Sequence, residues 1–555
     1  MKILQAFFAI VVLCCLAQVQ EPAQPAPETK GTISGRVLAE GQPVVNAVVT
    51  ASTMGAMLPR SATTDEDGNF QITGLATAAY VVRASLPGYV MTPLLGQSGE
   101  QQRIRVGESV TLNMLKGGAM TGKVFNASGE PIPGLSIVVL RLRDEVGTLR
   151  SYETFTRRTD DRGVYRIFGL PPGSYLVYTN GKDFGWSHNA DDQSNDGPTY
   201  HPSSTRDTAA ELKLGSGEEL SGIDIRYRGE RGYRISGKLV GALNGFGATI
   251  FLQDANSGAV VATDWRSPGQ KRPEDPIPFE IRGAADGEYE LIAEVKNGNE
   301  DGSTSQPRRV TISGADVTGI ELRMNPLVSV TGNVLLEAAK VATTCENYKS
   351  SAFEEVAVSL LPDAPPQQRQ TMLPSALPAR TGEFKIRFVD AGRYRFSLQL
   401  PNRHWYVRSI TTPPDPRTKK AADLALTGLT VKASERPTSA LLTLALGAAE
   451  LKGKLKSSKA ALASLKVHLV PAETEASANV LRYAEAAPAS DGAFAFLHLS
   501  PGKYWLMVRT VAATADTRPA AWDSTERAKL RREAEAANIL LELKPCQRVV
   551  DYVQK

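Results

Sequence analysis

Apolar and polar residues alternate along short runs of this chain, and the same run recurs five times. In each copy an aromatic residue is followed ten positions later by a tyrosine, which opens another alternating run. Alternation with period two places one face of a strand in a core and the other in water. A fixed spacing in five copies therefore predicts one small all-β unit used five times. The aromatic pairs are Phe70/Tyr80, Tyr165/Tyr175, Phe279/Tyr289, Phe384/Tyr394 and Phe494/Tyr504.

A glycine in the first predicted strand marks the start of each unit, as in Ile33-Ser-Gly35-Arg-Val37. The equivalent glycine recurs at irregular intervals, which indicates a constant core with loops of variable length. We therefore predict a tandem array of five small β-sandwich modules, and no other large domain. The predicted ranges are 1–17 for a signal peptide, 18–30 for a Pro-rich linker, and 31–116, 117–228, 229–325, 326–446 and 447–555 for modules 1 to 5.

The repeated aromatic residues need no ligand to explain them. A buried aromatic side chain removes roughly 150–250 Å² from water, worth about 4–6 kcal/mol at ~25 cal/mol per Å² before entropy is charged. We therefore interpret all ten as structural core residues.

The joints between modules are short, because only a few residues separate the last strand of one module from the first strand of the next. Short joints restrict the movement of neighbouring domains. The sequence therefore predicts a semi-rigid rod.

One helix interrupts the β pattern near the C-terminus. Residues 524–537 (STERAKLRREAEAA) are good helix formers, and Asp523 or Ser524 supplies an N-cap. Its apolar stripe is thin, so we expect a surface helix that covers a sheet edge. A helix that binds a partner is the alternative.

The N-terminus has the pattern of an export signal. Lys2 precedes an apolar stretch from Ile3 to Leu16, and the small residue Ala17 stands before a polar, Pro-rich segment. We predict cleavage after Ala17 and export to the periplasm, the cell surface or the medium, with no transmembrane segment left after cleavage. Lipidation at Cys14 or Cys15 is the less favoured alternative.

Charge gives no support to a nucleic-acid partner. Lys and Arg number 63 against 59 for Asp and Glu, and no long run of one sign stands out.

Two cysteines, Cys345 and Cys546, remain after signal cleavage. An even pair in an exported chain invites a disulfide, and two unpaired buried thiols are the alternative. A zinc or redox site would want Cys or His at ligand spacing in the sequence, and neither cysteine has such a neighbour. We therefore predict no metal site and no cofactor.

The first two modules resemble the carboxypeptidase regulatory-like domain. In module 1 the resemblance rests on Gly41-Gln-Pro43, on Thr64-Asp65-x-x-Gly68-x-Phe70 and on Pro87-Gly88-Tyr89; in module 2 it rests on Thr159-Asp160-x-x-Gly163-x-Tyr165 and Pro172-Gly173-x-Tyr175. The resemblance implies a prealbumin-like, carbohydrate-binding-like β-sandwich, related in fold to starch-binding and collagen-adhesin B-type modules. The stretch Pro198-Thr-Tyr200-His201-Pro202, followed by Gly222-Ile223-Asp-Ile225, looks like a pattern of secreted multi-module proteins of soil bacteria. In the enzymes that give the family its name, catalysis belongs to a separate zinc peptidase domain, and no His-x-x-Glu pair is present here.

The most unusual segment is residues 180–206, a long polar insertion in module 2 that is rich in aromatic, histidine and aspartate residues. Long loops on rigid scaffolds often carry function, and aromatic rings beside polar groups can stack on sugars. The structural alternative is a loop whose aromatic residues tuck over the sheet edge. The candidate ligand-binding residues are Phe184, Trp186, His188, Tyr200 and His201.

These observations favour a non-catalytic, exported scaffold or adhesion protein that is a monomer and binds a polysaccharide or a cell-surface protein. The first alternative is a carbohydrate-binding protein that uses the module 2 loop. A hydrolase is a further alternative, but the five histidines are scattered and nothing in the sequence activates a particular Ser or Cys.

Overall fold

The computed structural model describes most of the chain from Gly31 onward. The described residues are 31–54, 58–94, 101–145, 147, 149–179, 196–241, 247–267, 275–296, 302–337, 345–346, 348, 350–363, 373–432, 438–456, 462, 465–489, 491–510 and 519–554.

The fold is all-β, as the alternation predicts. Modules 1 and 2 each contain two sheets packed face to face, and the first strand of each module pairs in parallel with its last strands. Module 1 contains β1 (Gly31–Ala39), β2 (Gln42–Pro43), β3 (Val48–Ser52), β4 (Arg60–Thr63), β5 (Asn69–Leu75), β6 (Ala79–Ser85), β7 (Tyr89–Met91), β8 (Ile104–Arg105) and β9 (Ser109–Lys116); module 2 contains β10 (Gly118–Phe125), β11 (Ser136–Asp144), β12 (Leu149–Arg158), β13 (Val164–Leu170), β14 (Gly173–Thr179), β15 (Thr199–Tyr200), η2 (Arg206–Thr208), β16 (Leu212–Leu214), β17 (Glu219–Leu220) and β18 (Ile225–Arg226).

Module 3 differs because its two sheets are joined into one. A short strand, β24, pairs with both β23 and β26, so one sheet runs β21-β20-β23-β24-β26-β19-β22 and curls back on itself. Its two end strands, β21 and β22, therefore lie next to each other without a ladder between them. The strands are β19 (Tyr233–Val240), β20 (Ala248–Asp254), β21 (Val260–Arg266), β22 (Ile277–Ala284), β23 (Gly287–Lys296), β24 (Gly302–Ser305), β25 (Arg308–Ile312) and β26 (Val317–Pro326).

Modules 4 and 5 return to two separate sheets each. Module 4 contains β27 (Val328–Leu336), η3 (Phe353–Glu355), β28 (Ala357–Pro362), β29 (Ser375–Ala376), β30 (Glu383–Val389), β31 (Gly392–Gln399), β32 (Trp405–Thr411), α1 (Leu424–Thr427), β33 (Leu429–Val431) and β34 (Thr438–Leu446); module 5 contains β35 (Ala449–Leu455), β36 (Leu465–Pro471), η4 (Thr474–Ala476), η5 (Val480–Arg482), β37 (Ala484–Ala486), β38 (Ala493–Leu499), β39 (Gly502–Thr510), η6 (Ala520–Trp522), α3 (Ser524–Ala537), β40 (Leu540–Leu543) and β41 (Arg548–Gln554).

The repeated glycine and the first aromatic residue of each module face each other across an antiparallel ladder. Gly237 pairs with Phe279, and a Cβ atom at Gly237 would lie 2.0 Å from the Ile320 carbonyl oxygen of the parallel neighbour strand. Glycine is therefore required here by close approach of the backbone rather than by its φ angle. The other four pairs are Gly35/Phe70, Gly122/Tyr165, Gly332/Phe384 and Gly453/Phe494.

The second aromatic residue of each module is a buried tyrosine with one constant hydrogen bond. In module 5, the Tyr504 hydroxyl donates to the Ser500 carbonyl oxygen, four residues upstream, at 2.6 Å. A buried phenol needs such a partner, and this bond fixes the turn that opens the next strand. The same i to i−4 bond joins Tyr80 to Ala76, Tyr175 to Pro171, Tyr289 to Ala285 and Tyr394 to Asp390.

Each predicted module range contains a hydrophobic cluster of its own, and all ten repeated aromatic residues are buried. The predicted helix is α3, and Asp523 caps it by accepting hydrogen bonds from the Thr525 and Glu526 backbone amides. Leu530 and Ala534 of α3 pack against Val470 and Met507. The helix thus covers a face of the module 5 sheet rather than an edge.

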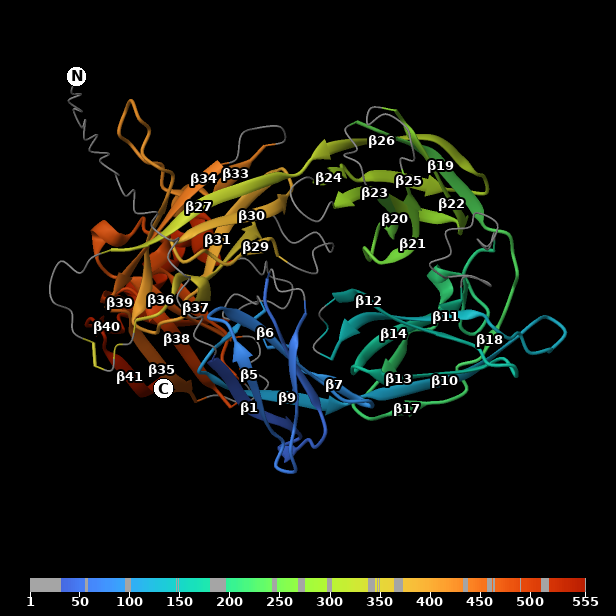
Figure 1. Ribbon diagram of the computed structural model, residues 1–555, viewed down its shortest axis with the longest axis horizontal. Coiled ribbons are helices and arrows are strands. Elements are labelled where there is room, and N and C mark those ends of the chain that lie inside the picture. The colour runs from blue at the N-terminus through green and yellow to red at the C-terminus, as the bar shows by residue number, and fades with distance from the viewer. Residues whose placement is uncertain are drawn as a thin grey trace, which may run out of the picture.

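The prediction of a rod is wrong, because the array closes on itself. Figure 1 shows modules 1 to 4 arranged around a ring, with module 5 beside module 4. Module 4 reaches module 1, where Arg105 donates hydrogen bonds to the Leu400 and Pro401 carbonyl oxygens. Gln399 adds two more contacts, accepting from the Arg103 amide at 3.0 Å and donating to the Gln101 carbonyl at 2.9 Å. The joints between modules are short, but the angles between successive modules bring module 4 back to module 1.

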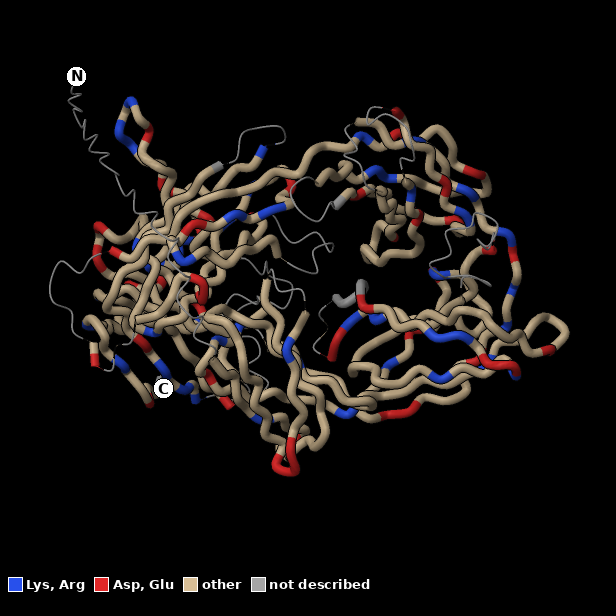
Figure 2. Tube along the Cα trace, viewed as in Figure 1, with Lys and Arg blue, Asp and Glu red and all other residues tan. Residues whose placement is uncertain are grey.

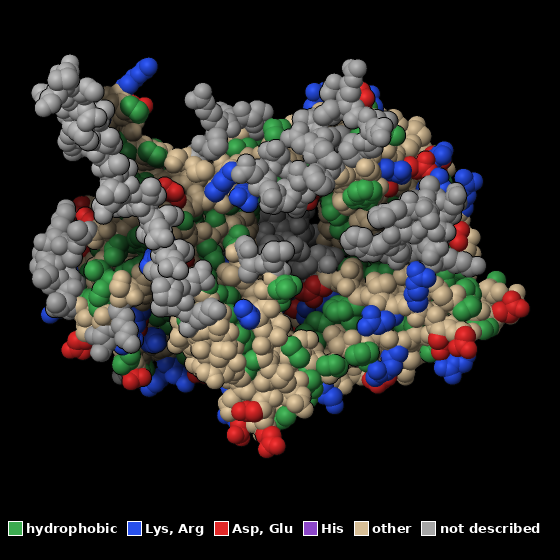
Figure 3. All heavy atoms as spheres, viewed as in Figure 1, with side chains coloured by type: hydrophobic (Ala, Val, Ile, Leu, Met, Phe, Trp, Pro, Cys, Tyr) green, Lys and Arg blue, Asp and Glu red, His purple; other side chains and the backbone are tan. Residues whose placement is uncertain are grey.

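Charges of both signs are interspersed along the trace (Figure 2). On the face shown in Figure 3, hydrophobic side chains are scattered among charged ones rather than gathered into one patch. None of the described helices is long and apolar enough to cross a membrane.

Candidate functional site: a cleft between modules 2 and 3

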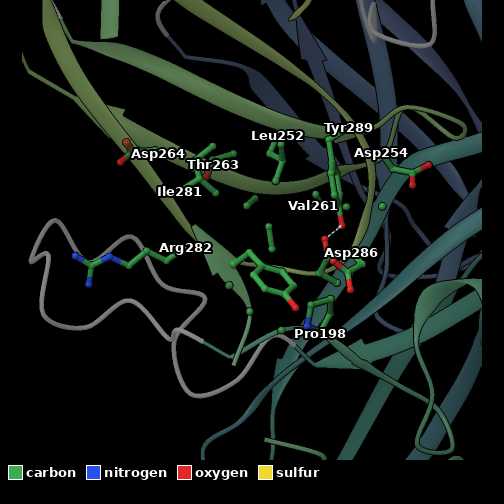
Figure 4. Close-up of a pocket in the computed structure, with 18 of the residues that line it drawn as sticks. Pro198, Leu252, Asp254, Val261, Thr263, Asp264, Ile281, Arg282, Asp286 and Tyr289 are labelled. Carbon is green, nitrogen blue, oxygen red and sulfur yellow. Dashed lines mark hydrogen bonds between the residues drawn. The ribbon is translucent and has the colours of Figure 1, made fainter. Parts of the chain in front are cut away.

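A cleft of about 2130 Å³ lies between modules 2 and 3. Module 3 forms most of its wall through β20, β21 and β22, and module 2 contributes mainly residues 196–200 and 205–207. Figure 4 shows Asp264 and Arg282 toward one end and Asp254 and Tyr289 toward the other. Leu252, Val261, Thr263 and Ile281 lie between these ends.

The cleft runs along the gap between β21 and β22, the two end strands of the curled module 3 sheet, which no ladder joins. We call this gap the seam. Side chains of β21 replace the missing ladder there: the Asp264 carboxylate accepts a hydrogen bond from the Glu280 amide of β22 at 3.1 Å. Arg266 donates to the Glu280 carbonyl oxygen at 3.4 Å and pairs with Asp264 at 2.6 Å. The seam is thus held by a carboxylate and a guanidinium, so polar groups converge at this wall of the cleft.

Burial raises the pKa of Asp264, while its hydrogen bond and ion pair with Arg266 oppose that change. At the other end, burial is also the main cause of the raised pKa of the Tyr289 phenol. The described lining residues include no histidine and no cysteine. The lining residues can therefore bind a ligand through hydrogen bonds, charge and apolar contact.

Beside the cleft, modules 2 and 3 are in direct contact. Arg206 of module 2 forms an ion pair with Asp254 of module 3 at 3.1 Å and donates to the Ser257 hydroxyl at 2.5 Å. Beside them, Tyr200 stacks on Tyr178 with ring centroids 4.8 Å apart, and Ala259 packs against the same cluster. These contacts fix the angle between the modules and so the width of the cleft.

An exposed tryptophan stands at the wall of this cleft. Trp265 is 49% exposed, and a Cβ atom at Gly247 would lie only 2.4 Å from its ring. The indole therefore lies against a residue that has no side chain, with about half of its surface open. Sequence reasoning missed Trp265, because neither alternate set of this strand, Val261/Thr263/Trp265 or Ala262/Asp264/Arg266, is uniformly apolar or polar.

The sequence-predicted loop residues fall differently. Tyr200 is 2% exposed and its ring is covered by Tyr178, so it offers no open platform for a sugar. The His201 ring donates through Nδ1 to the Asp224 carbonyl oxygen at 2.6 Å and so acts within module 2. Phe184, Trp186 and His188 lie outside the described residues.

Cys345 and Cys546 form a disulfide with a Cα–Cα distance of 5.5 Å, which joins module 4 to module 5. Disulfides of this kind are typical of extracytoplasmic proteins. His404, which is distant in sequence from both cysteines, lies beside the disulfide, so that one potential ligand atom from each of the three residues falls within 4.8 Å of the others. No local spacing could have indicated this cluster, because the three residues come from three separate segments.

One family model matches the first two modules. The family described as "Carboxypeptidase regulatory-like domain" matches residues 32–114 and 119–189, which are the cores of modules 1 and 2. The chain carries tandem carboxypeptidase regulatory-like domains. Modules 3 to 5 share the glycine–aromatic register and the tyrosine bond of these domains, although the family match does not extend to them.

No curated protein matches the chain. Among solved structures, the Bacillus anthracis TIE protein is 16% identical over 53% of this chain and 50% of its own, with a TM-score of 0.15. This chain thus spans about half the length of that protein. A streptococcal ancillary pilin is 10% identical over 53% of this chain and 98% of its own (TM-score 0.15). BcpA, the major pilin subunit of Bacillus cereus, is 13% identical over 53% and 99% (TM-score 0.13).

Proposed function

We propose that this protein is an exported, non-catalytic binding scaffold whose ligand, a polysaccharide, occupies the cleft between modules 2 and 3. The observation that carries the proposal is the half-exposed Trp265 beside the polar seam. The closed ring supports it too, because closure holds the two walls of the cleft at a fixed separation.

The chemistry of the wall suits a sugar chain. An indole face packs against the C–H groups of a pyranose ring, while carboxylate and guanidinium groups bind its hydroxyls. Arg266 and the neighbouring Arg282, whose side chains are 33% and 34% exposed, supply guanidinium groups within the same lining. The volume of the cleft, about 2130 Å³, favours a chain of several sugar units over a single small molecule.

The test is binding of the full chain to a panel of soluble polysaccharides, followed by calorimetry on each hit. We expect Trp265→Ala to lower affinity roughly two- to tenfold, because an aromatic stacking contact is worth about 0.5–1.5 kcal/mol. A panel without any hit would contradict the carbohydrate part of the proposal.

Phe168→Ala is the matched control. Phe168 is 46% exposed, close to the exposure of Trp265, and lies on β13, outside the cleft. Its loss should leave affinity unchanged. Equal losses in the two variants would indicate non-specific adhesion to exposed aromatic residues instead of a site in the cleft.

A scaffold or adhesion role with a protein ligand is the second candidate, and the ring of modules 1 to 4, with module 5 beside module 4, supports it by presenting several module surfaces on one frame. Binding to a cell-surface extract that survives removal of its glycans, and that Trp265→Ala does not affect, would favour this candidate.

A further inference from the structure

The disulfide between modules 4 and 5 has a third potential metal ligand beside it. Cys345 lies in the segment before η3, His404 stands directly before β32, and Cys546 lies between β40 and β41. Their sulfur and imidazole nitrogen atoms all lie within 4.8 Å of one another. Two thiols and one imidazole at such distances match the donor set of a zinc site.

His404 is buried, and one of its ring nitrogens makes no hydrogen bond to the described residues. The residue is 5% exposed, and its Nε2 has no hydrogen-bond partner among the described residues. A buried polar atom without a partner is costly, so its retention calls for a reason. The Tyr348 ring packs edge-on against the imidazole, with centroids 6.1 Å apart, and limits its rotation.

The backbone around the cluster is held by bonds that do not depend on the disulfide. The Gly447 and Ala448 amides both donate to the His404 carbonyl oxygen at 2.9 Å, and the Cys546 amide donates to the Gly447 carbonyl at 3.0 Å. One short turn therefore sets the position of His404 relative to Cys546. Opening the disulfide would leave these two residues in place.

We propose that Cys345, His404 and Cys546 form a zinc site that is closed while the disulfide is intact and opens on its reduction. An external thiol reductant supplies two electrons and two protons; the S–S bond breaks, both sulfurs become thiols, and the reductant is oxidised to its own disulfide. Zn²⁺ then displaces the two thiol protons and binds two thiolates and the His404 imidazole.

The site would keep the joint between modules 4 and 5 intact in either redox state. Three protein ligands leave a fourth tetrahedral position. The Glu450 carboxylate, 8% exposed on β35, interacts electrostatically with His404 and would help to balance the charge of a bound ion. A covalent bond under oxidising conditions would thus be replaced by a metal bridge under reducing ones.

The experiment uses the full chain, oxidised or reduced with a phosphine that does not itself bind zinc through sulfur. Zinc is measured after dialysis, and affinity is measured by competition with a chromophoric chelator. We expect about one zinc per reduced chain, none per oxidised chain, and none after Cys345→Ser. His404→Gln should weaken binding at least ~10-fold.

His468→Gln is the matched control, because His468 is also a buried histidine, 4% exposed, but lies within the module 5 sheet. Its zinc affinity should equal that of the unchanged chain. Equal affinity in His404→Gln, or no stoichiometric zinc on the reduced chain, would overturn the proposal.

If His404→Gln does not fold, X-ray absorption at the zinc edge of the reduced, unmodified chain decides the question. The proposed donor set requires two sulfur ligands and one imidazole nitrogen. A zinc shell without imidazole would overturn the proposal.

Discussion

The joint between modules 2 and 3 and the joint between modules 4 and 5 connect similar modules through different contacts. At the first, the Arg206–Asp254 ion pair and the Arg206–Ser257 hydrogen bond connect the modules beside an open cleft. At the second, a disulfide, the stacking of Arg395 on Trp522 and a histidine hydrogen bond to Trp405 hold them together. The modules themselves are built alike. The difference indicates that the joints, rather than the modules, carry the distinctive features of this chain.

The largest expected effect is loss of the covalent tie. Cys345→Ser with Cys546→Ser removes a link across 201 residues and should lower the free energy of unfolding by about 4 kcal/mol. Urea denaturation measures this loss. Hydrogen exchange should accelerate around β32 and β41 while β21 of module 3 stays unchanged. Faster exchange in both regions would contradict the view that the two joints are independent.

The second effect is a pH dependence at the joint of modules 4 and 5. Burial lowers the pKa of His498 to about 4, and nearby Arg105 adds to this, although the hydrogen bond to the Trp405 carbonyl opposes it. Because the folded pKa lies below the unfolded value of about 6.5, stability should fall as pH drops from about 6.5 to 4, by up to ~3 kcal/mol.

Unfolding measured across this pH range checks the expectation. His498→Gln should remove that part of the pH dependence, whereas His201→Gln in module 2 should not. An unchanged profile in His498→Gln would show that other groups control the acid response.

A smaller effect is expected at the open joint. Arg206→Ala removes the ion pair with Asp254 and the bond to Ser257, and should cost about 2 kcal/mol because both groups are largely buried. The cleft should widen and ligand affinity should fall with it. Arg162→Ala is the control, since its pair with Asp160 is exposed on a module 2 turn and should contribute less than about 1 kcal/mol.

The smallest effect on stability is expected for a variant that tests ligand binding in the cleft. Trp265→Ala should change the free energy of unfolding by less than about 0.5 kcal/mol, because surface substitutions usually do. Its melting temperature should therefore stay close to that of the unchanged protein while its affinity for the polysaccharide falls. A large destabilisation would mean that the indole supports the seam of module 3 instead.

The sequence predicted what depends on local period. Alternation fixes the faces of strands, so Phe70 and Tyr80 and their counterparts were identified as core residues, and propensity with an Asp cap identified α3. The closed ring could not be predicted, because it depends on joint angles and on distant contacts such as Arg105 with Leu400. His404 was missed for the same reason: its proximity to the cysteines exists only in the folded chain.

The most direct test of the account is small-angle X-ray scattering of the full chain in solution. A closed ring should give a radius of gyration only modestly above the ~24 Å of a compact chain of this length. Arg105→Ala, which removes the hydrogen bonds to Leu400 and Pro401, should increase it. A scattering profile of an extended rod for the unchanged protein, insensitive to Arg105→Ala, would contradict the closed arrangement on which the cleft depends.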